Sequence, residues 1–162
     1  MTTPTKRQLS ANDKRVARDI KQYGCHVISV FDPNGRLPFF SYSIGIQDSS
    51  AAPDVIVIGL RPEFGGYLVN EYNRQVRKGK RFKRGRRYEG FLVGFPVYFE
   101  PARMERVRRY AYGCARYYDG RDYSVVQLIF PSTKGVWPWN KSASKSLVKN
   151  QPMLGRLRPD RP

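Results

Sequence analysis

The stretch from Gly24 to Leu60 constrains the fold more than any other part of the chain. It carries three runs rich in β-branched and aromatic residues, GCHVISVF, FFSYSIGI and DVIVIGL. The first two are separated by Asp32-Pro33-Asn34-Gly35, where Pro fixes φ and Asn-Gly tolerates positive φ, so a tight turn is expected. The alternation from Phe39 to Ile46 predicts an antiparallel hairpin with one face on a core. The continuous run Val55–Leu60 is typical of a central strand covered on both faces.

Helices and further strands are expected around this hairpin. We expect helices over residues 10–23, 62–79 and 102–118, a polar loop over 47–53, and strands over 91–99 and 125–130. The pair Gly65-Gly66 in the second helix marks either a close approach of backbone or a later helix start. The sequence therefore predicts an α+β fold, with a mixed, mostly antiparallel sheet of about five strands and three helices packed mainly on one face. The third and fifth strands are candidates for parallel pairing.

The two ends of the chain differ from its middle. We interpret residues 1–9 as a flexible leader, residues 10–140 as a single α+β domain, and residues 141–162 as a basic, partly mobile tail. The motif Trp137-Pro138-Trp139 precedes the tail and has two interpretations. Its rings either form a binding surface for a partner or hold the C-terminal segment on the core. We favour the second interpretation, because buried indole rings contribute large apolar area.

Targeting and cysteine patterns indicate a cytoplasmic protein. The N-terminal residues lack the apolar stretch of a signal peptide. No window approaches the roughly 18 apolar residues of a membrane span. The two cysteines, Cys25 and Cys114, are far apart and show no CxxC spacing, which favours a reducing cytosol over a disulfide framework.

Charge is the strongest indication of a partner. The chain has 30 Lys and Arg against 13 Asp and Glu, a formal net charge of +17. A small domain needs a net charge of only about 2–8 for solubility, and a larger excess destabilises the folded state by self-repulsion. We therefore expect a polyanionic partner: nucleic acid, either RNA or DNA, or an acidic protein. An anionic membrane surface is disfavoured, because the basic helices lack a wide Trp- and Leu-rich face.

The densest positive charge lies in residues 74–87, RQVRKGKRFKRGRR, where nine residues are Lys or Arg. Such a run is usually only a solvated surface. Two features favour nucleic acid: aromatic residues lie in and beside the run, as base stacking requires, and arginine, whose planar fork binds phosphate, outnumbers lysine. The predicted nucleic-acid-binding residues are Arg74, Arg77, Lys78, Lys80, Arg81, Phe82, Lys83, Arg84, Arg86, Arg87 and Tyr88. Arg106 and Arg109 join them if the third helix packs alongside.

Evidence for catalysis is weak. His26 is the only histidine, and with Tyr42 across the hairpin it is the candidate catalytic residue, although a half-buried structural histidine is the favoured interpretation. Cys25 precedes it, but successive strand residues point to opposite faces. One histidine and two dispersed cysteines do not indicate a metal site. Gly79 and Gly85 do not form a phosphate-binding loop motif, and no cofactor is expected.

Several segments together resemble a known family. GCHVISVF, FFSYSIGI, PDVIVIGL, the Tyr-Tyr-Asp-Gly after the third helix, VVQLIFP and VWPW resemble the bacterial domain of unknown function 4262. The match covers roughly residues 12–152, and the SYSIGI and DVIVIGL pair is its most specific part. The resemblance implies an α+β domain in the bacterial cytosol and implies no activity. It also implies a histidine where this chain has Ala52, and a less basic segment than residues 74–87.

Three functions remain open. The favoured one is a small cytosolic basic module that binds nucleic acid through residues 74–88. The first alternative is a protein-interaction or inhibitor module that docks on an acidic partner through the same surface. The second is a small enzyme of unknown reaction with a site near His26. The sequence favours a binding module over an enzyme, because no catalytic set of residues is evident.

Overall fold

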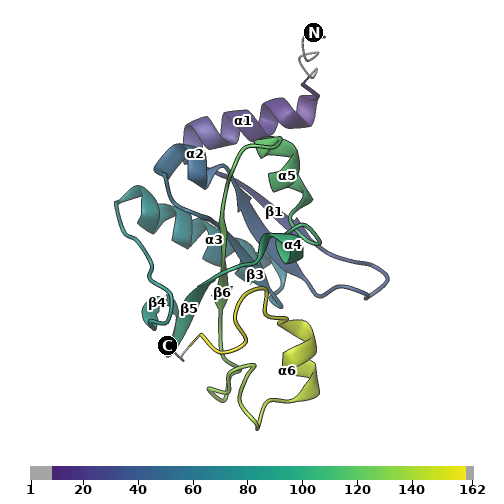
Figure 1. Cartoon of the computed structure of the whole chain (residues 1–162), viewed down its shortest axis with the longest axis vertical. Coiled ribbons are helices and arrows are strands. Elements are labelled where there is room, and N and C mark those ends of the chain that lie inside the picture. Colours follow the sequence, from purple (N-terminus) through teal and green to yellow (C-terminus); the bar gives the residue numbers. More distant parts are fainter. Residues whose placement is uncertain (1–8, 160–162) are drawn as a thin grey trace.

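The computed structural model describes residues 9–159 and contains one mixed sheet of six strands, in the order β1-β2-β3-β6-β5-β4 (Figure 1). β3 and β6 pair in parallel, and all other neighbours are antiparallel. The elements are α1 (Ala11–Tyr23), β1 (His26–Val30), β2 (Phe40–Ile44), α2 (Ile46–Ser50), β3 (Asp54–Ile58), α3 (Pro62–Arg77), β4 (Tyr88–Leu92), β5 (Phe95–Pro101), α4 (Met104–Val107), α5 (Tyr112–Tyr118), β6 (Val125–Ile129) and α6 (Lys145–Asn150). The predicted α+β class is confirmed, with six strands where the sequence indicated about five.

The opening hairpin forms as its turn residues predict. β1 and β2 pair with His26 opposite Ile44 and Val30 opposite Phe40. The Asp32 carboxylate accepts hydrogen bonds from the backbone N–H groups of Asn34, Arg36 and Leu37, at 2.9 to 3.0 Å. Local bonds of this kind are why Asp is favoured in turns. They fix the first part of the long loop between the two strands.

Two elements differ from the sequence prediction, and in each case the chain changes direction at a glycine. The run predicted as one strand over residues 91–99 is two strands, joined at Val93-Gly94, where Gly94 has φ +80° and the Val93 side chain is fully exposed. The polar segment predicted as a loop over residues 47–53 overlaps the one-turn helix α2. This helix begins directly after Gly45, whose backbone is in the left-handed conformation. A hydrophobic run alone does not show where a chain turns back.

Helices cover both faces of the sheet, which corrects the prediction that they lie mainly on one. On the first face, Val55 and Val57 of β3 pack with Leu68, Val69 and other residues of α3. On the second face, Ile56 and Ile58 of β3 pack with residues from α1, α4 and α5. Alternate residues of the central strand are therefore buried on opposite sides, as its continuous apolar run predicts.

The helix predicted over residues 102–118 is divided into α4 and α5. The break lets α5 approach the sheet at Gly113, where an added Cβ atom would lie 2.7 Å from Ile44 Cδ1 and 2.8 Å from the Tyr42 hydroxyl. The Gly113 N–H donates to that hydroxyl at 3.0 Å. Val107, Cys114 and Tyr118, which recur at helical spacing through this stretch, are all buried in the core.

The C-terminal segment folds back on the sheet. Gln151 is buried, and its side chain bonds to both the N–H and the C=O of Phe130. Trp137 packs on Tyr98 with ring centroids 4.9 Å apart, and Trp139 stacks on Trp137, so these rings hold the segment on the core as predicted. The predicted leader lies, apart from Leu9, outside the described residues, and the partial mobility of the tail remains a prediction. None of the helices within residues 9–159 is long and apolar enough to cross a membrane.

The close packing of α3 on β2 gives a first testable prediction. An added Cβ atom at Gly65 would lie 2.7 Å from Ser41 Oγ, a buried hydroxyl that is 2.7 Å from Ser29 Oγ, whereas a Cβ atom at Gly66 meets nothing nearer than 3.8 Å. Alanine in a helix is favoured over glycine by about 1 kcal/mol. We expect Gly66→Ala to raise the melting temperature and Gly65→Ala to lower it, as measured by circular dichroism. Equal shifts for the two variants would contradict this packing.

Candidate functional site

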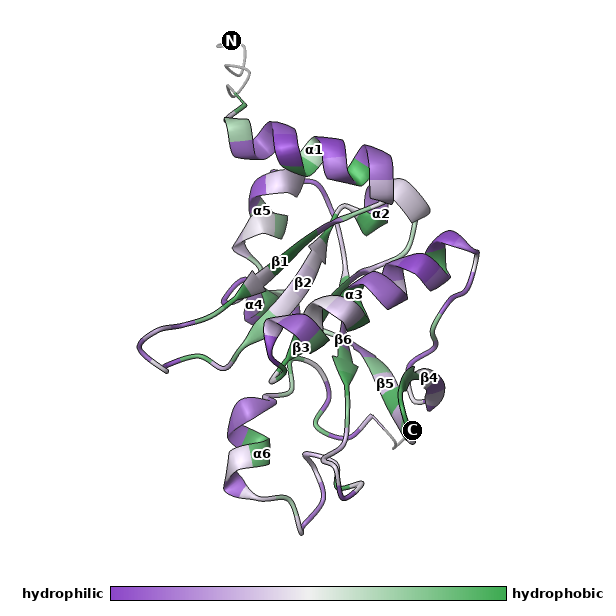
Figure 2. Cartoon of the chain, turned by 180° about the vertical axis from the view of Figure 1, so that it is seen from behind, coloured by the Kyte–Doolittle hydropathy of each residue, from purple (hydrophilic) through white to green (hydrophobic). Residues whose placement is uncertain are grey.

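The predicted basic segment, residues 74–87, occupies the last turn of α3 and the chain that leads to β4. Its nine Lys and Arg side chains are all exposed. Figure 2 shows hydrophilic residues along the C-terminal half of α3 and in the chain beyond it. The residues predicted to bind nucleic acid are therefore brought together at one place, at the end of α3.

The two aromatic residues of the segment face the protein interior. Phe82 lies 4.4 Å from Phe99 and 5.5 Å from Phe91 between ring centroids, and it also packs on Tyr72. Tyr88 meets Phe82 edge to face at 4.9 Å. Both rings belong to the core under α3, so they do not form the stacking surface between cations that the sequence suggested. Sequence order shows that a ring lies among cations but not which way it points.

These rings and four further contacts hold the segment in place. The Tyr88 hydroxyl accepts from the backbone N–H of Lys83 at 2.6 Å. The Arg81 guanidinium donates to the carbonyls of Val76 and Ser50, at 3.0 and 2.6 Å. Lys80 Nζ lies 5.6 Å from the Phe82 ring centroid, within the range of a cation–π contact. The segment is thus an anchored loop with its cations outward.

Few of its cations are neutralised. Arg74 forms an ion pair with Glu71. The hydrogen bonds from its guanidinium stabilise the Glu71 carboxylate, so the pKa of Glu71 lies below its usual value. Arg77 donates to the Tyr23 carbonyl and Arg87 to the Tyr98 hydroxyl. Five exposed cations of the segment neither pair with a carboxylate nor donate a side-chain hydrogen bond among residues 9–159: Lys78, Lys80, Lys83, Arg84 and Arg86. These five form the free cation cluster.

Arg106 and Arg109 do not extend the basic segment. Arg106 belongs to α4, whose residue Val107 packs into the core on the second face of the sheet, and its side chain donates to the Met153 carbonyl at 3.0 Å. Phe82 and Tyr88 pack on the first face. The sheet therefore separates the two groups of arginines, which corrects the prediction that they converge.

The catalytic candidates of the hairpin are each held by a structural contact. His26 Nδ1 lies 2.7 Å from a carboxylate oxygen of Asp19 in α1, and the imidazole is largely buried. Tyr42 is buried, its hydroxyl accepts from Gly113, and burial raises its pKa to about 12. Cys25 lies in the core of the first face, so it does face away from His26 as predicted. The Asp19–His26 pair ties α1 to β1.

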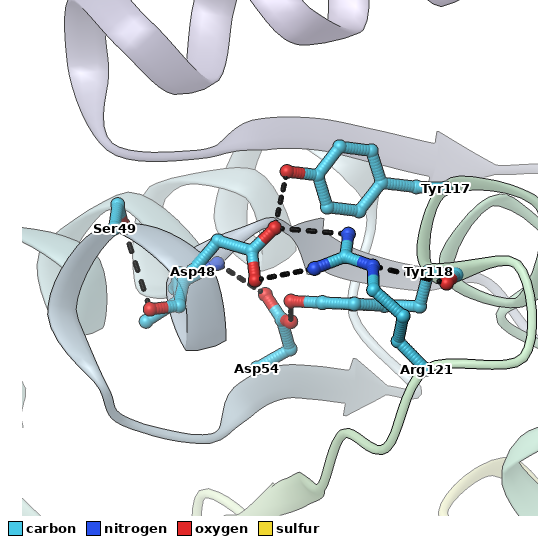
Figure 3. Close-up of polar contacts among 7 residues, drawn as sticks. Asp48, Ser49, Asp54, Tyr117, Tyr118 and Arg121 are labelled. Atoms are coloured by element: carbon cyan, nitrogen blue, oxygen red, sulfur yellow. Dashed lines mark hydrogen bonds and ion pairs between the residues drawn. The ribbon is translucent and has the colours of Figure 1, made fainter.

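A buried polar cluster at the start of β3 was not predicted. The carboxylate of Asp54 is fully buried and accepts from the Ser43 hydroxyl at 2.7 Å, from the Ile46 N–H at 3.0 Å, and from the Tyr118 hydroxyl. Burial raises the pKa of Asp54, while these hydrogen bonds act in the opposite direction. Figure 3 shows Tyr118 reaching from α5 to Asp54 beneath an outer pair, Asp48 and Arg121.

The outer pair closes this cluster toward solvent. Arg121 donates two hydrogen bonds to the Asp48 carboxylate, each 3.0 Å long, and the Tyr117 hydroxyl donates to the same carboxylate at 2.6 Å. Ion pairing with Arg121 lowers the pKa of Asp48. Asp54 has no exposed surface for a substrate, so the cluster joins α2, α5, β2 and β3 rather than forming a reaction site. Asp54 is a carboxylate placed directly before the continuous apolar run of β3, and this is the sequence signal that would have identified it.

No group of three His, Cys, Asp or Glu side chains within residues 9–159 is placed to hold a metal ion. Ala52, where the family resemblance implies a histidine, is buried in the core of the first face.

Comparison with known proteins identifies a family but no function. A family model described as a domain of unknown function (DUF4262) matches residues 19–144, which confirms the resemblance seen in the hairpin and β3 segments. No curated protein and no solved structure matches the chain.

The buried cluster predicts a specific effect on stability. Replacing Tyr118 by Phe leaves the Asp54 carboxylate without one of its donors in a site that water does not reach. We expect a loss of about 1–3 kcal/mol in the free energy of unfolding, measured by urea denaturation. Tyr123→Phe is the matched control: its ring stacks on Tyr118 at 4.3 Å, but its hydroxyl bonds to no residue among 9–159. That variant should stay within about 0.5 kcal/mol of the wild type, and equal losses would contradict the role of the hydroxyl.

The cysteines give a prediction about reactivity. Cys25 and Cys114 are buried free thiols, and burial raises the pKa of Cys25 to about 12. Because the thiolate is the reactive form, both side chains should resist a disulfide-exchange reagent at pH 8 in the folded protein. Both should react at once in denaturant. Rapid reaction of either thiol under native conditions would contradict its burial.

Proposed function

We propose that this chain, which belongs to the DUF4262 family, is a module that binds a polyanion, with nucleic acid as the first candidate, through residues 74–88. The observation that carries the proposal is the free cation cluster. Its five cations lie within residues 78–86 and have no carboxylate partner in the described chain. Positive charge that the protein does not neutralise itself raises the local concentration of polyanions and their association rate.

The anchoring of the loop supports the same proposal. Its backbone is held by Phe82 in the core and by the hydrogen bonds of Arg81 and of the Lys83 N–H. A loop already ordered before binding loses less conformational entropy when a ligand arrives. The cost that remains is the ordering of the long Lys and Arg side chains themselves.

The contacts of this surface are expected to be with phosphates. Its aromatic rings are inside, so the surface offers cations to the backbone of a nucleic acid and little that distinguishes one base from another. Binding should therefore fall steeply with salt and depend weakly on sequence. The two free, buried thiols support the assignment of the chain to the cytosol within this proposal.

An electrophoretic or anisotropy titration with RNA and DNA tests the proposal. If the five cations contact five phosphates of a duplex, raising salt from 50 to 200 mM should weaken binding roughly 500-fold. The variant Lys83→Glu/Arg84→Glu/Arg86→Glu should abolish binding at 100 mM salt. A control of equal charge change is Arg103→Glu/Arg108→Glu/Arg109→Glu, which alters three exposed arginines that flank α4, a helix that packs on the other face of the sheet. That control should retain most of the affinity.

Two results would overturn the nucleic-acid proposal. One is binding that does not change with salt, and the other is equal loss of binding in the two triple variants. An acidic protein partner, which would use the same cations, makes a different prediction. Its capture by the wild-type protein would survive nuclease treatment and would be lost in the Lys83, Arg84 and Arg86 variant.

A further inference from the structure

A second basic region, distinct from residues 74–88, surrounds a cleft at the other end of α3. The cleft has a volume of about 710 Å³ and lies between the loop joining β1 to β2 and helix α6. In both views of the chain, this loop and α6 project from the same side of the molecule (Figures 1 and 2). Pockets for small organic ligands span about 300–1,000 Å³, so the cleft has the size of a ligand site.

One wall of the cleft is an aromatic pair. Phe31 and Phe39, on the two sides of the loop, stack with their ring centroids 5.4 Å apart and their planes 23° from parallel. Phe31 is 62% exposed, so its ring is accessible to a ligand. Nucleobases stack on rings presented in this way. The stacking surface that Phe82 and Tyr88 do not provide is therefore present here.

The opposite wall and the rim carry cations. Lys145 and Lys149 lie four residues apart on α6 and both line the cleft, as residues one helical turn apart should. Arg36 from the loop and Arg61 at the start of α3 complete the set. Arg61 is also 3.9 Å from Glu63, with both side chains more than 70% exposed, so this pair is weak.

Among residues 9–159, Asp32 supplies the one carboxylate that lines the cleft, and this carboxylate is already engaged. Asp32 accepts the three backbone hydrogen bonds of the turn, which hold its pKa below the usual range. It fixes the loop that carries Phe31 and Arg36. At Gly59, with φ +105°, an added Cβ atom would lie 2.7 Å from the Asn150 carbonyl, so glycine is what allows the end of α6 to approach β3 and close the cleft.

We propose that this cleft binds a nucleoside phosphate, with the base stacked on Phe31 and the phosphates held by Lys145, Lys149 and Arg61. An aromatic wall facing a group of cations matches the two parts of that ligand, an apolar ring and a multiply charged anion. The ligand is either a free nucleotide or one residue of a single strand, because both present the same base and phosphate. The proposal stands apart from the binding assigned to residues 74–88, since no residue is shared.

Calorimetry on the full chain at low salt tests the proposal with three probes: ADP, inorganic pyrophosphate and a five-nucleotide oligothymidylate. Wild-type protein should bind ADP at least about tenfold more tightly than pyrophosphate, because only ADP has a base to stack. Phe31→Ala, a change at an exposed ring, should remove that advantage and leave pyrophosphate binding unchanged. Lys145→Glu/Lys149→Glu should lose both ligands.

Matched variants keep the two basic regions distinct. Lys134→Glu/Lys141→Glu makes the same charge change on exposed lysines outside the cleft and should bind ADP like the wild type. The Lys83, Arg84 and Arg86 variant should also retain ADP binding. Tighter binding of the oligonucleotide than of ADP, lost in Phe31→Ala, would support the site with a strand as its ligand. Absence of binding by both ADP and the oligonucleotide, or equal affinity of wild type and Phe31→Ala for whichever of the two binds, would overturn it.

Discussion

The buried carboxylate of Asp54 is the interaction on which the rest of the structure depends. A carboxylate taken out of water is tolerated only where hydrogen-bond donors replace its hydration. Here those donors come from Ser43 in β2, Ile46 in α2 and Tyr118 in α5, so one side chain at the start of β3 fixes three other elements. Asp48 and Arg121 then cover the site from outside. The arrangement sets where α5 sits on the sheet, and with it the second face of the core.

Aromatic and cationic side chains have separate roles in this chain. In the segment after α3, Phe82 and Tyr88 hold the backbone from inside while the free cation cluster faces water. At the cleft beside α6, an exposed ring and cations line the same cavity. The two regions lie at opposite ends of α3, whose 16 residues span about 24 Å. That helix is the rigid element that sets the distance between them.

Features that depend on neighbouring residues, such as turns and helix ends, could be predicted from the sequence. Features that depend on contacts between distant residues could not. Asp32 and Gly35 specify a turn, and Ser10, Asp13 and Gly24 specify the ends of α1, so these elements were predictable. Apolar residues at helical spacing over 104–118 indicated a core face. The break between α4 and α5 was not predictable, because it lets Gly113 pack against Tyr42 and Ile44, which are remote in sequence. Likewise, the charge of residues 74–87 was visible, whereas the inward position of Phe82 depends on Phe99. The structural role of Asp54 could not be predicted either, because its hydrogen-bond partners come from other elements of the fold.

The parallel pairing of β3 with β6 has a consequence for synthesis of the chain. On the ribosome, β1, β2, β3 and α3 emerge together and can associate through contacts that are close in sequence. β6 emerges only after α3, β4, β5, α4 and α5. Until then the apolar DVIVI strand has one unpaired edge, and such edges promote association between nascent chains. Translation speed through the basic segment and the helices that follow it would therefore set how long that hazard lasts.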